Sequence, residues 1–125
     1  MDRNDVARLI RNAYGVEPET PWPKYPGNQV YRGGSGKWFA LVMDVAAEKL
    51  GLPGDGNMEI MNVKCDPALL GSLLSDEGFF PAYHMNKANW ISVVLNEKTD
   101  GEAIRFLLRR SFELTGGRQS RPKKE

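Results

Sequence analysis

The chain has 125 residues, 41% hydrophobic and 26% charged, a length and balance typical of one folded domain with a single core. It has one cysteine, Cys65, and one histidine, His84, which excludes an internal disulfide and a zinc site of the Cys/His type. No stretch approaches about eighteen consecutive apolar residues, and no apolar segment follows the polar first residues. We therefore expect a cytoplasmic protein without a membrane span, a metal or a cofactor.

The net charge of +1 is unevenly distributed along the chain. Residues 118–125 carry four basic groups and one acidic group, and residues 1–117 carry thirteen basic and fifteen acidic groups. The sequence therefore predicts a single domain over residues 1–117 with a charge of −2, followed by a basic, disordered tail over residues 118–125. Because nucleic-acid affinity depends on neutralising phosphates, a DNA contact must come from a local patch or from the tail.

The chain begins with a predicted helix over residues 3–14, where apolar residues recur at helical spacing and Asp2 can cap the start. The next segment, residues 18–26, contains four prolines. These prolines forbid regular structure and predict an extended crossing. We expect Trp22 and Tyr25 to pack against the rest of the domain from this segment.

A β-hairpin is predicted next, with a short strand over residues 29–32, a glycine-rich turn over residues 33–36 and a longer strand over residues 37–45. Residues 46–56 form a connection that contains three glycines and one proline. A third strand is expected over residues 58–65, where apolar residues again dominate.

A second helix is predicted to open at Asp66, which can act as its N-cap, with Pro67 at the first helical position. Aromatic and apolar residues then predict a fourth strand over residues 79–85. Residues 86–89 have the composition of a turn, and residues 90–95 read as a fifth strand.

The last helix is predicted to begin at a capping box, Thr99-Asp100-Gly101-Glu102, and to stop at Gly116-Gly117. Its inner face should consist of Ile104, Leu107, Leu108, Ser111 and Phe112. The resulting order is α-β-β-β-α-β-β-α. Because most connections are short, we expect an α+β fold, a two-layer α/β sandwich in which helices cover one face of an antiparallel sheet.

Several strings in the chain are distinctive. They are Gly36-Lys37-Trp38-Phe39-Ala40, Val63-Lys64-Cys65-Asp66-Pro67, Pro81-Ala82-Tyr83-His84-Met85-Asn86-Lys87-Ala88-Asn89-Trp90-Ile91, and Ser111-Phe112. With the order of elements, these strings resemble the MmcQ/YjbR family of small bacterial proteins over roughly residues 2–115. The resemblance implies a secretion-chaperone-like, double-wing α/β fold and DNA binding, with no enzyme activity and no cofactor.

Strand alternation predicts which side chains the helices cover. The covered set is Phe39, Leu41, Met43, Val45, Met61, Val63, Cys65, Ile91, Val93 and Leu95. The opposite face should then display Trp38, Val42, Ile60, Lys64, Trp90 and Val94. Exposed apolar patches of this kind commonly mark association sites.

Three interpretations of that opposite face stay open. It could form a protein interface, most simply a homodimer through the sheet. It could be a nucleic-acid platform, with bases stacked on Trp38 and Trp90 and phosphates bound by Arg32, Lys64 and Lys87. It could also be covered by the proline-rich segment, which would bury both indole rings.

Tyr83, His84, Asn86 and Lys87 cluster near one turn and, with Trp90, could form a polar corner for a small molecule. A general base at His84 has no nucleophile beside it in the sequence, so we expect no enzyme and no catalytic residue. The candidate residues for binding nucleic acid or a partner are therefore Arg32, Trp38, Lys64, Tyr83, His84, Asn86, Lys87 and Trp90.

The last helix also carries Arg105, Arg109 and Arg110, which we expect on a solvated face, with Glu113 pairing to Arg109 at i, i+4 spacing. Cys65 is expected to be buried and inert. The primary prediction is a non-enzymatic binding protein that contacts DNA. The alternative is a dimeric or chaperone-like protein-interaction module without a nucleic-acid role.

Overall fold

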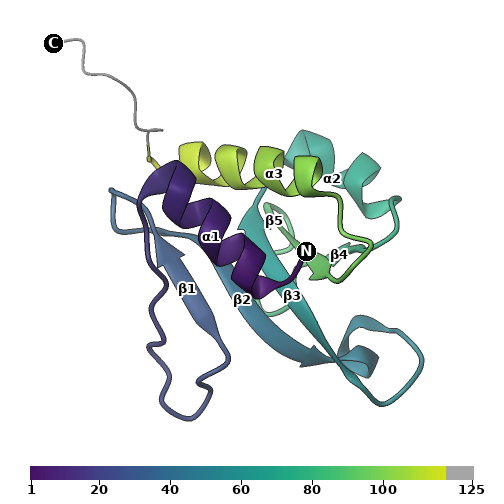
Figure 1. Cartoon of the computed structure of the whole chain (residues 1–125). Helices are drawn as coiled ribbons and strands as arrows, with labels where there is room; N and C mark the ends of the chain where they lie inside the picture. The colour runs from purple at the N-terminus through teal and green to yellow at the C-terminus, as the bar shows by residue number, and fades with distance from the viewer. Residues whose placement is uncertain (118–125) are drawn as a thin grey trace, which may run out of the picture.

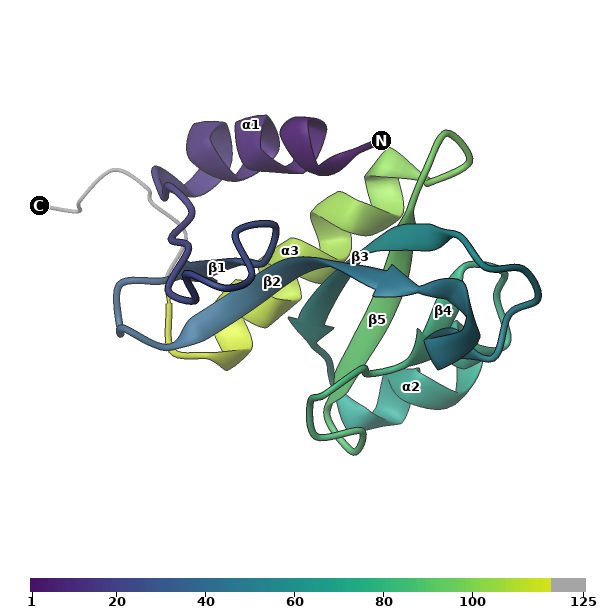
Figure 2. The same ribbon diagram turned by 90° about the horizontal axis from the view of Figure 1, so that it is seen from below.

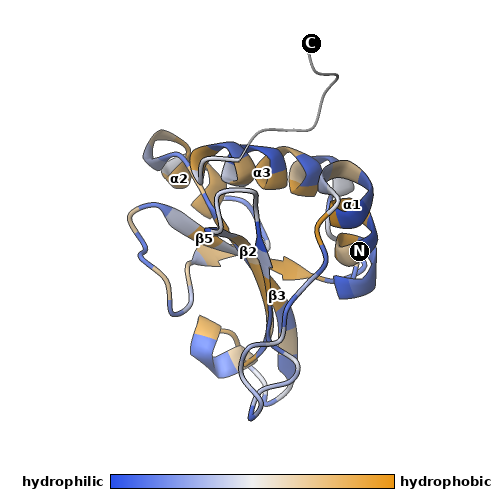
Figure 3. Cartoon of the chain, turned by 90° about the vertical axis from the view of Figure 1, so that its left-hand side faces the viewer, coloured by the Kyte–Doolittle hydropathy of each residue, from blue (hydrophilic) through white to orange (hydrophobic). Residues whose placement is uncertain are grey.

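The computed structural model describes residues 1–117, so the predicted basic tail over residues 118–125 lies outside the described residues. In chain order the elements are α1 (Arg3–Tyr14), β1 (Gln29–Arg32), β2 (Trp38–Ala46), the 3-10 helix η1 (Ala47–Leu50), β3 (Asn57–Lys64), α2 (Pro67–Leu74), β4 (Phe79–Pro81), β5 (Trp90–Leu95) and α3 (Gly101–Leu114). The strands form one antiparallel sheet in the order β1-β2-β3-β5-β4, with the three α-helices on one side (Figures 1 and 3). The predicted α+β fold is confirmed.

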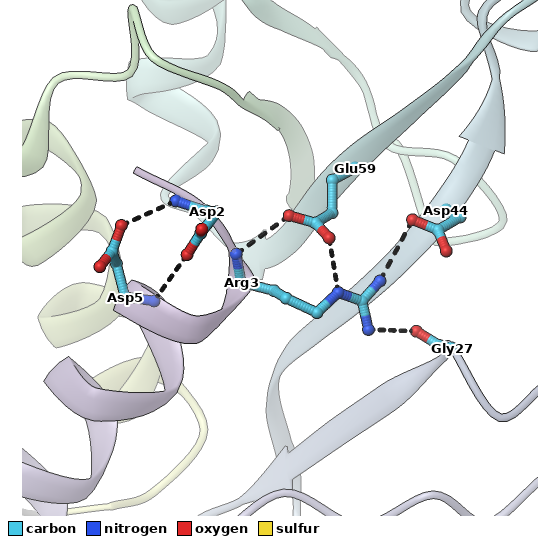
Figure 4. Close-up of polar contacts among 6 residues, drawn as sticks. All are labelled: Asp2, Arg3, Asp5, Gly27, Asp44 and Glu59. Carbon is cyan, nitrogen blue, oxygen red and sulfur yellow. Dashed lines mark hydrogen bonds and ion pairs between the residues drawn. The ribbon is translucent and has the colours of Figure 1, made fainter.

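The N-terminus of α1 is fixed twice, by a capping box and by Arg3 (Figure 4). The Asp2 side chain accepts a hydrogen bond from the backbone N–H of Asp5, and the Asp5 side chain accepts one from Asp2. The Arg3 guanidinium donates to Glu59 of β3 at 2.6 Å and to the Gly27 carbonyl at 2.6 Å, and it pairs with Asp44 of β2 at 3.2 Å. One half-buried arginine thus joins the helix to two strands and to the loop before β1.

A β-bulge in β2 reverses the predicted alternation of that strand. Tyr31 pairs with Ala40 but Arg32 pairs with Trp38, so Phe39 is an extra residue with no partner in β1. Phe39 and Ala40 both lie in the core beneath the helices. Beyond the bulge Val42 also faces the helices. The prediction for β2 after Phe39 was therefore wrong, because the bulge shifts the phase by one residue.

The face of the sheet away from the α-helices, here called the loop face, carries Arg32, Trp38, Leu41, Met43, Val45, Ile60, Asn62, Lys64, Trp90, Ser92 and Val94. It holds a second small core of Met43, Val45, Ile60 and Val94, against which Leu50, Met58, Phe80 and Tyr83 pack. The predicted exposure of Ile60 and Val94 was wrong, since η1 and the segment after β4 supply side chains that cover them. The prediction for β3 and β5 is otherwise confirmed: Met61, Val63, Cys65, Ile91, Val93 and Leu95 all lie in the core beneath the helices.

The proline-rich segment lies beside β1. Glu19 and Val30 exchange both backbone hydrogen bonds, each at 2.9 Å, and so form an isolated antiparallel bridge. Seen from below in Figure 2, the connection between α1 and β1 crosses close to β1, and β2 passes in front of α3. The Trp22 ring packs edge-on against Trp38, with centroids 5.7 Å apart. The segment thus covers one side of the Trp38 indole and leaves it half-buried.

The C-terminal helix is fastened to the sheet by a serine. Ala40 pairs with Val63, so the next rung of the β2–β3 ladder would join Phe39 to Lys64. The Ser111 hydroxyl occupies that position, donating to the Phe39 carbonyl at 2.6 Å and accepting from the Lys64 N–H at 2.9 Å. Ser111 is fully buried, and the predicted inner face of the helix is confirmed.

Two predicted boundaries differ from the structure, because side chains form hydrogen bonds with backbone groups at each of them. The strand expected over residues 79–85 ends at Pro81. The last helix is capped by Asp100, whose carboxylate accepts from the Glu102 N–H at 3.0 Å, and not by Thr99. The Thr99 hydroxyl instead accepts from the Asn96 N–H at 2.7 Å, within the turn before the helix.

Candidate binding site

Four of the predicted site residues lie in a row across one end of the sheet, on the loop face. Arg32 of β1 pairs with Trp38 of β2, and Lys64 of β3 pairs with Trp90 of β5. The Arg32 guanidinium carbon lies 5.8 Å from the centre of the Trp38 ring, within the range of a cation–π contact. The Arg32 guanidinium also forms an ion pair with the Glu19 carboxylate at 3.0 Å. Cations and indoles thus alternate along this end of the sheet.

The segment between β4 and β5 folds back over the loop face because two buried polar side chains hold its backbone. The Asn62 side-chain amide donates to the Tyr83 carbonyl at 3.0 Å, and the Tyr83 N–H donates to the Ser92 hydroxyl at 2.9 Å. The Ser92 hydroxyl in turn donates to Asn62. Asn62 and Ser92 are both fully buried. This closed set of hydrogen bonds replaces strand pairing and places the Tyr83 side chain on the second core.

His84 follows Tyr83 with a positive φ of 59°, the one non-glycine residue in residues 1–117 with left-handed backbone. Left-handed backbone is uncommon outside glycine, and the exposed imidazole packs edge-on against the Tyr83 ring, with the ring centroids 4.1 Å apart. The Asn86 side chain accepts from the Ala88 N–H at 2.9 Å and so shapes the turn, while Lys87 is exposed. The structure therefore gives Asn86 a local backbone role.

The loop face contains a pocket of about 500 Å³, called here the aromatic pocket. It is lined by Trp22, Tyr25, Asn28, Trp38, Leu41, Met43, Asp44, Tyr83, His84 and Met85. Three predicted site residues, Trp38, Tyr83 and His84, belong to this lining. Tyr25 is the most exposed large apolar side chain of the described residues, at 61%. An aromatic side chain exposed beside a pocket is available to a ligand.

The chemistry of the aromatic pocket suits a flat ring that carries hydrogen-bonding groups. Aromatic faces and the two methionines offer stacking and polarizable contacts. The Asn28 amide can donate and accept, and the Asp44 carboxylate can accept, although it is shared with Arg3. The sequence had indicated Trp22 and Tyr25 only as packing residues. It missed Met43 as a pocket residue because the bulge turns Met43 away from the helices.

The remaining expectations concern Cys65, Asp66 and the arginines of α3. Cys65 is buried, and burial raises the pKa of its thiol. Asp66 precedes α2 but its carboxylate caps no backbone N–H; it binds the Arg110 guanidinium through both oxygens at 2.8 and 2.9 Å. Hydrogen bonding from Arg110 lowers the pKa of Asp66. Glu113 pairs with Arg110 at 2.9 Å and not with Arg109, so the predicted i, i+4 pair was wrong.

Two further observations apply to the described part of the chain. None of its helices combines the length and the apolar composition that crossing a membrane requires. No three histidine, cysteine or acidic side chains gather there as a group of metal ligands.

Known proteins resemble this chain both in fold and in sequence. A protein from Deinococcus radiodurans shares the fold with a TM-score of 0.68 at 21% identity, over 91% of this chain and 78% of that one. A crystal structure of a protein from Pseudomonas syringae matches with a TM-score of 0.89 at 40% identity, over 92% of this chain and 99% of that one. The uncharacterized protein YyaQ of Bacillus subtilis strain 168 is 44% identical over 117 residues, 92% of this chain and 98% of YyaQ. A family model described as YjbR matches residues 11–114. With a family match over most of its length, the chain belongs to the YjbR family, which confirms the resemblance seen in its strings.

Proposed function

We propose that this protein binds DNA in single-stranded form through its loop face and performs no catalysis of its own. The observation that carries the proposal is that the aromatic pocket shares Trp38 with the row of alternating cations and indoles. Aromatic faces beside cations are the usual means of holding single strands without duplex geometry. In this arrangement one unstacked base enters the pocket, and the adjoining phosphates meet Lys64 and Lys87.

A single strand fits the charge distribution better than a duplex. Residues 1–117 have a formal charge of −2, so the domain has no broad positive field for a duplex backbone. Stacking does not depend on such a field, and each stacked base contributes about 1–3 kcal/mol. Two or three stacked bases and a few phosphate contacts are then enough for binding that can be measured at low salt.

A homodimer or a chaperone-like contact through the sheet has less support. The apolar side chains of the loop face that would meet a second sheet, Leu41, Met43, Ile60 and Val94, are already buried within one chain. Such interfaces need a contiguous apolar surface that is free before association. The protein-interaction alternative stays a prediction, and size-exclusion chromatography with light scattering tests it.

The DNA proposal is tested by fluorescence anisotropy of a labelled oligothymidylate of about twelve nucleotides, a length within the usual site size of such proteins. We expect Tyr25→Ala and Lys64→Gln each to weaken binding, because the first removes an exposed ring of the pocket and the second removes a cation of the row. Leu74→Ala and Lys49→Gln are matched controls, since Leu74 is also an exposed large apolar residue, at 38%, and neither residue lines the aromatic pocket.

Salt dependence separates phosphate contacts from stacking. The slope of log affinity against log salt concentration should fall by about 0.7 in Lys64→Gln and stay unchanged in Tyr25→Ala. The proposal fails if the full chain does not bind the oligonucleotide at low salt. It also fails if the two control variants weaken binding as much as the two site variants do.

A further inference from the structure

A second cavity lies on the helix side of the molecule, between α1 and α3, and shares no lining residue with the aromatic pocket. Its volume is about 540 Å³, and it is lined by Met1, Asp5, Arg8, Leu9, Asn12, Ala13, Tyr14, Arg105 and Arg109. Figures 1 and 3 show the two helices running next to each other in the same layer. Arg8 and Asn12 are four residues apart on α1, and Arg105 and Arg109 are four apart on α3, so each pair shares one helix face. We call this cavity the arginine cleft.

The arginine cleft has an excess of positive charge. Its lining contains three arginines and one aspartate, and the aspartate, Asp5, pairs with Arg8 at 2.7 Å. Within residues 1–117, Arg105 and Arg109 form no ion pair. Arg110 on the same helix behaves differently, since it binds both Asp66 and Glu113. Glu113, the carboxylate that the sequence offers to Arg109, pairs with Arg110 instead, and its charge also acts on Tyr14 of the cleft lining.

The two arginines of α3 differ in their surroundings. The Arg105 guanidinium lies close to Gly101, so this side chain folds back over the first turn of α3. The Arg109 guanidinium carbon lies 5.9 Å from the centre of the Phe106 ring. A guanidinium that already packs on a ring, as that of Arg109 does, loses less conformational freedom when it binds an anion.

Tyr14, which lines the cleft, carries a hydrogen-bond donor on a ring that neighbouring aromatic side chains hold in place. The Tyr14 ring packs against Phe112 and Phe39, with centroids 4.5 and 5.7 Å apart. A tyrosine hydroxyl is protonated at neutral pH, and burial raises the pKa of Tyr14 further; the charge of Arg109 opposes that rise and the charge of Glu113 adds to it. The Asn12 amide adds a further donor to the lining.

From this arrangement we propose that the arginine cleft binds a compact polyanion, such as the di- or triphosphate group of a small molecule. Guanidiniums donate hydrogen bonds and accept none, and their fork matches the oxygens of phosphate. Three of them around one cavity favour an anion whose charges lie close together over a strand whose single charges are spaced out. The proposal uses different residues from the DNA site, so either one can fail without the other.

The test is isothermal titration calorimetry of the full chain with inorganic tripolyphosphate, and with orthophosphate and sulfate as separate arms. We expect tripolyphosphate to bind at least about tenfold more tightly than either smaller anion, because it can meet several guanidiniums at once. Arg105→Gln and Arg109→Gln should each weaken tripolyphosphate binding by about tenfold or more. The affinity of Arg109→Lys for tripolyphosphate should lie between those of the wild type and Arg109→Gln, because lysine keeps the charge and lacks the forked guanidinium.

Arg11→Gln is the matched control, since Arg11 is an exposed arginine of α1 that does not line the cleft. It should change the affinity for tripolyphosphate by less than about twofold, as expected for a surface charge outside the site. Thermal unfolding of each variant checks that it is folded. The proposal is wrong if no anion produces heat, or if Arg11→Gln weakens binding as much as Arg109→Gln. It is also wrong if Arg109→Gln weakens binding of the oligonucleotide and leaves the affinity for tripolyphosphate unchanged. The cleft would then be part of the surface that binds the DNA strand.

Discussion

Replacing Ser111 by alanine tests how α3 is joined to the sheet. The hydroxyl satisfies two backbone groups at once, the Phe39 carbonyl at 2.6 Å and the Lys64 N–H at 2.9 Å, in a position that solvent does not reach. A buried donor or acceptor left without a partner costs about 1–3 kcal/mol. With two such groups, and some relaxation of the strands, we expect Ser111→Ala to lower the free energy of unfolding by about 2–4 kcal/mol.

That loss is a large share of the stability of a domain this size, which is of the order of 5–15 kcal/mol. Urea unfolding followed by circular dichroism measures it, and the slope of the transition should not change. Ser72→Ala is the control, because Ser72 is exposed on α2 and its hydroxyl only reaches back to the Leu69 carbonyl at 3.3 Å. A loss below about 0.5 kcal/mol for Ser111→Ala would show that Phe39 and Lys64 can close the rung directly, and the reasoning would be refuted.

The Tyr31 hydroxyl is buried without a hydrogen-bond partner, so Tyr31→Phe should leave the stability at pH 7 unchanged or raise it by up to about 1 kcal/mol. Burial raises the pKa of Tyr31 from its ordinary 10.0 to about 12. The folded chain then holds a proton that the unfolded chain has lost, so between pH 10 and 12 the wild type should lose about 1–2 kcal/mol more than Tyr31→Phe, as urea titrations at both pH values would show. Hydrogen bonding from Arg110 lowers the pKa of Asp66, so this pair stabilises the fold above the unfolded pKa of aspartate and ceases to do so as pH falls through the folded pKa. Acid unfolding of Arg110→Gln should therefore be less steep there than that of the wild type, and equal steepness would contradict the assignment. At His84, whose φ is 59°, His84→Ala should be less stable than His84→Gly by about 1 kcal/mol, because only glycine takes left-handed backbone without steric cost; equal thermal midpoints would argue against strain at this turn.

The elements that the sequence predicts best are those whose signals are local. The bounds of α1, β1 and β5 are confirmed, because a cap, a helical period or a run of β-forming residues lies within each segment itself. The inner face of α3 is confirmed for the same reason. Five residues at helical spacing define one stripe wherever the helix finally packs.

The errors arise where a distant partner decides the local structure. The phase of β2 depends on the bulge at Phe39, which exists only because of how β1 pairs with it. β4 ends early because Asn62 and Ser92 bind the backbone of Tyr83. No property of residues 79–85 alone indicates either side chain.

The candidate sites follow the same division. Trp38, Lys64 and Trp90 of the loop face could be selected from strand alternation, although Ile60 and Val94 on the same face proved to be buried. The arginine cleft could not be predicted. It depends on Arg8 lying across from Arg105 and Arg109, about a hundred residues later in the chain, and on Glu113 pairing with Arg110.

The loop-face proposal can be tested most directly through the three indole N–H signals of the protein in a two-dimensional proton–nitrogen NMR spectrum, because the chain has three tryptophans and all lie at this face or beside it. Adding oligothymidylate should shift the signals of Trp22 and Trp38, which line the aromatic pocket, and leave the amide signals of Arg105 and Arg109 in place. Unmoved indole signals at saturating oligonucleotide, or shifts confined to α1 and α3, would contradict the account.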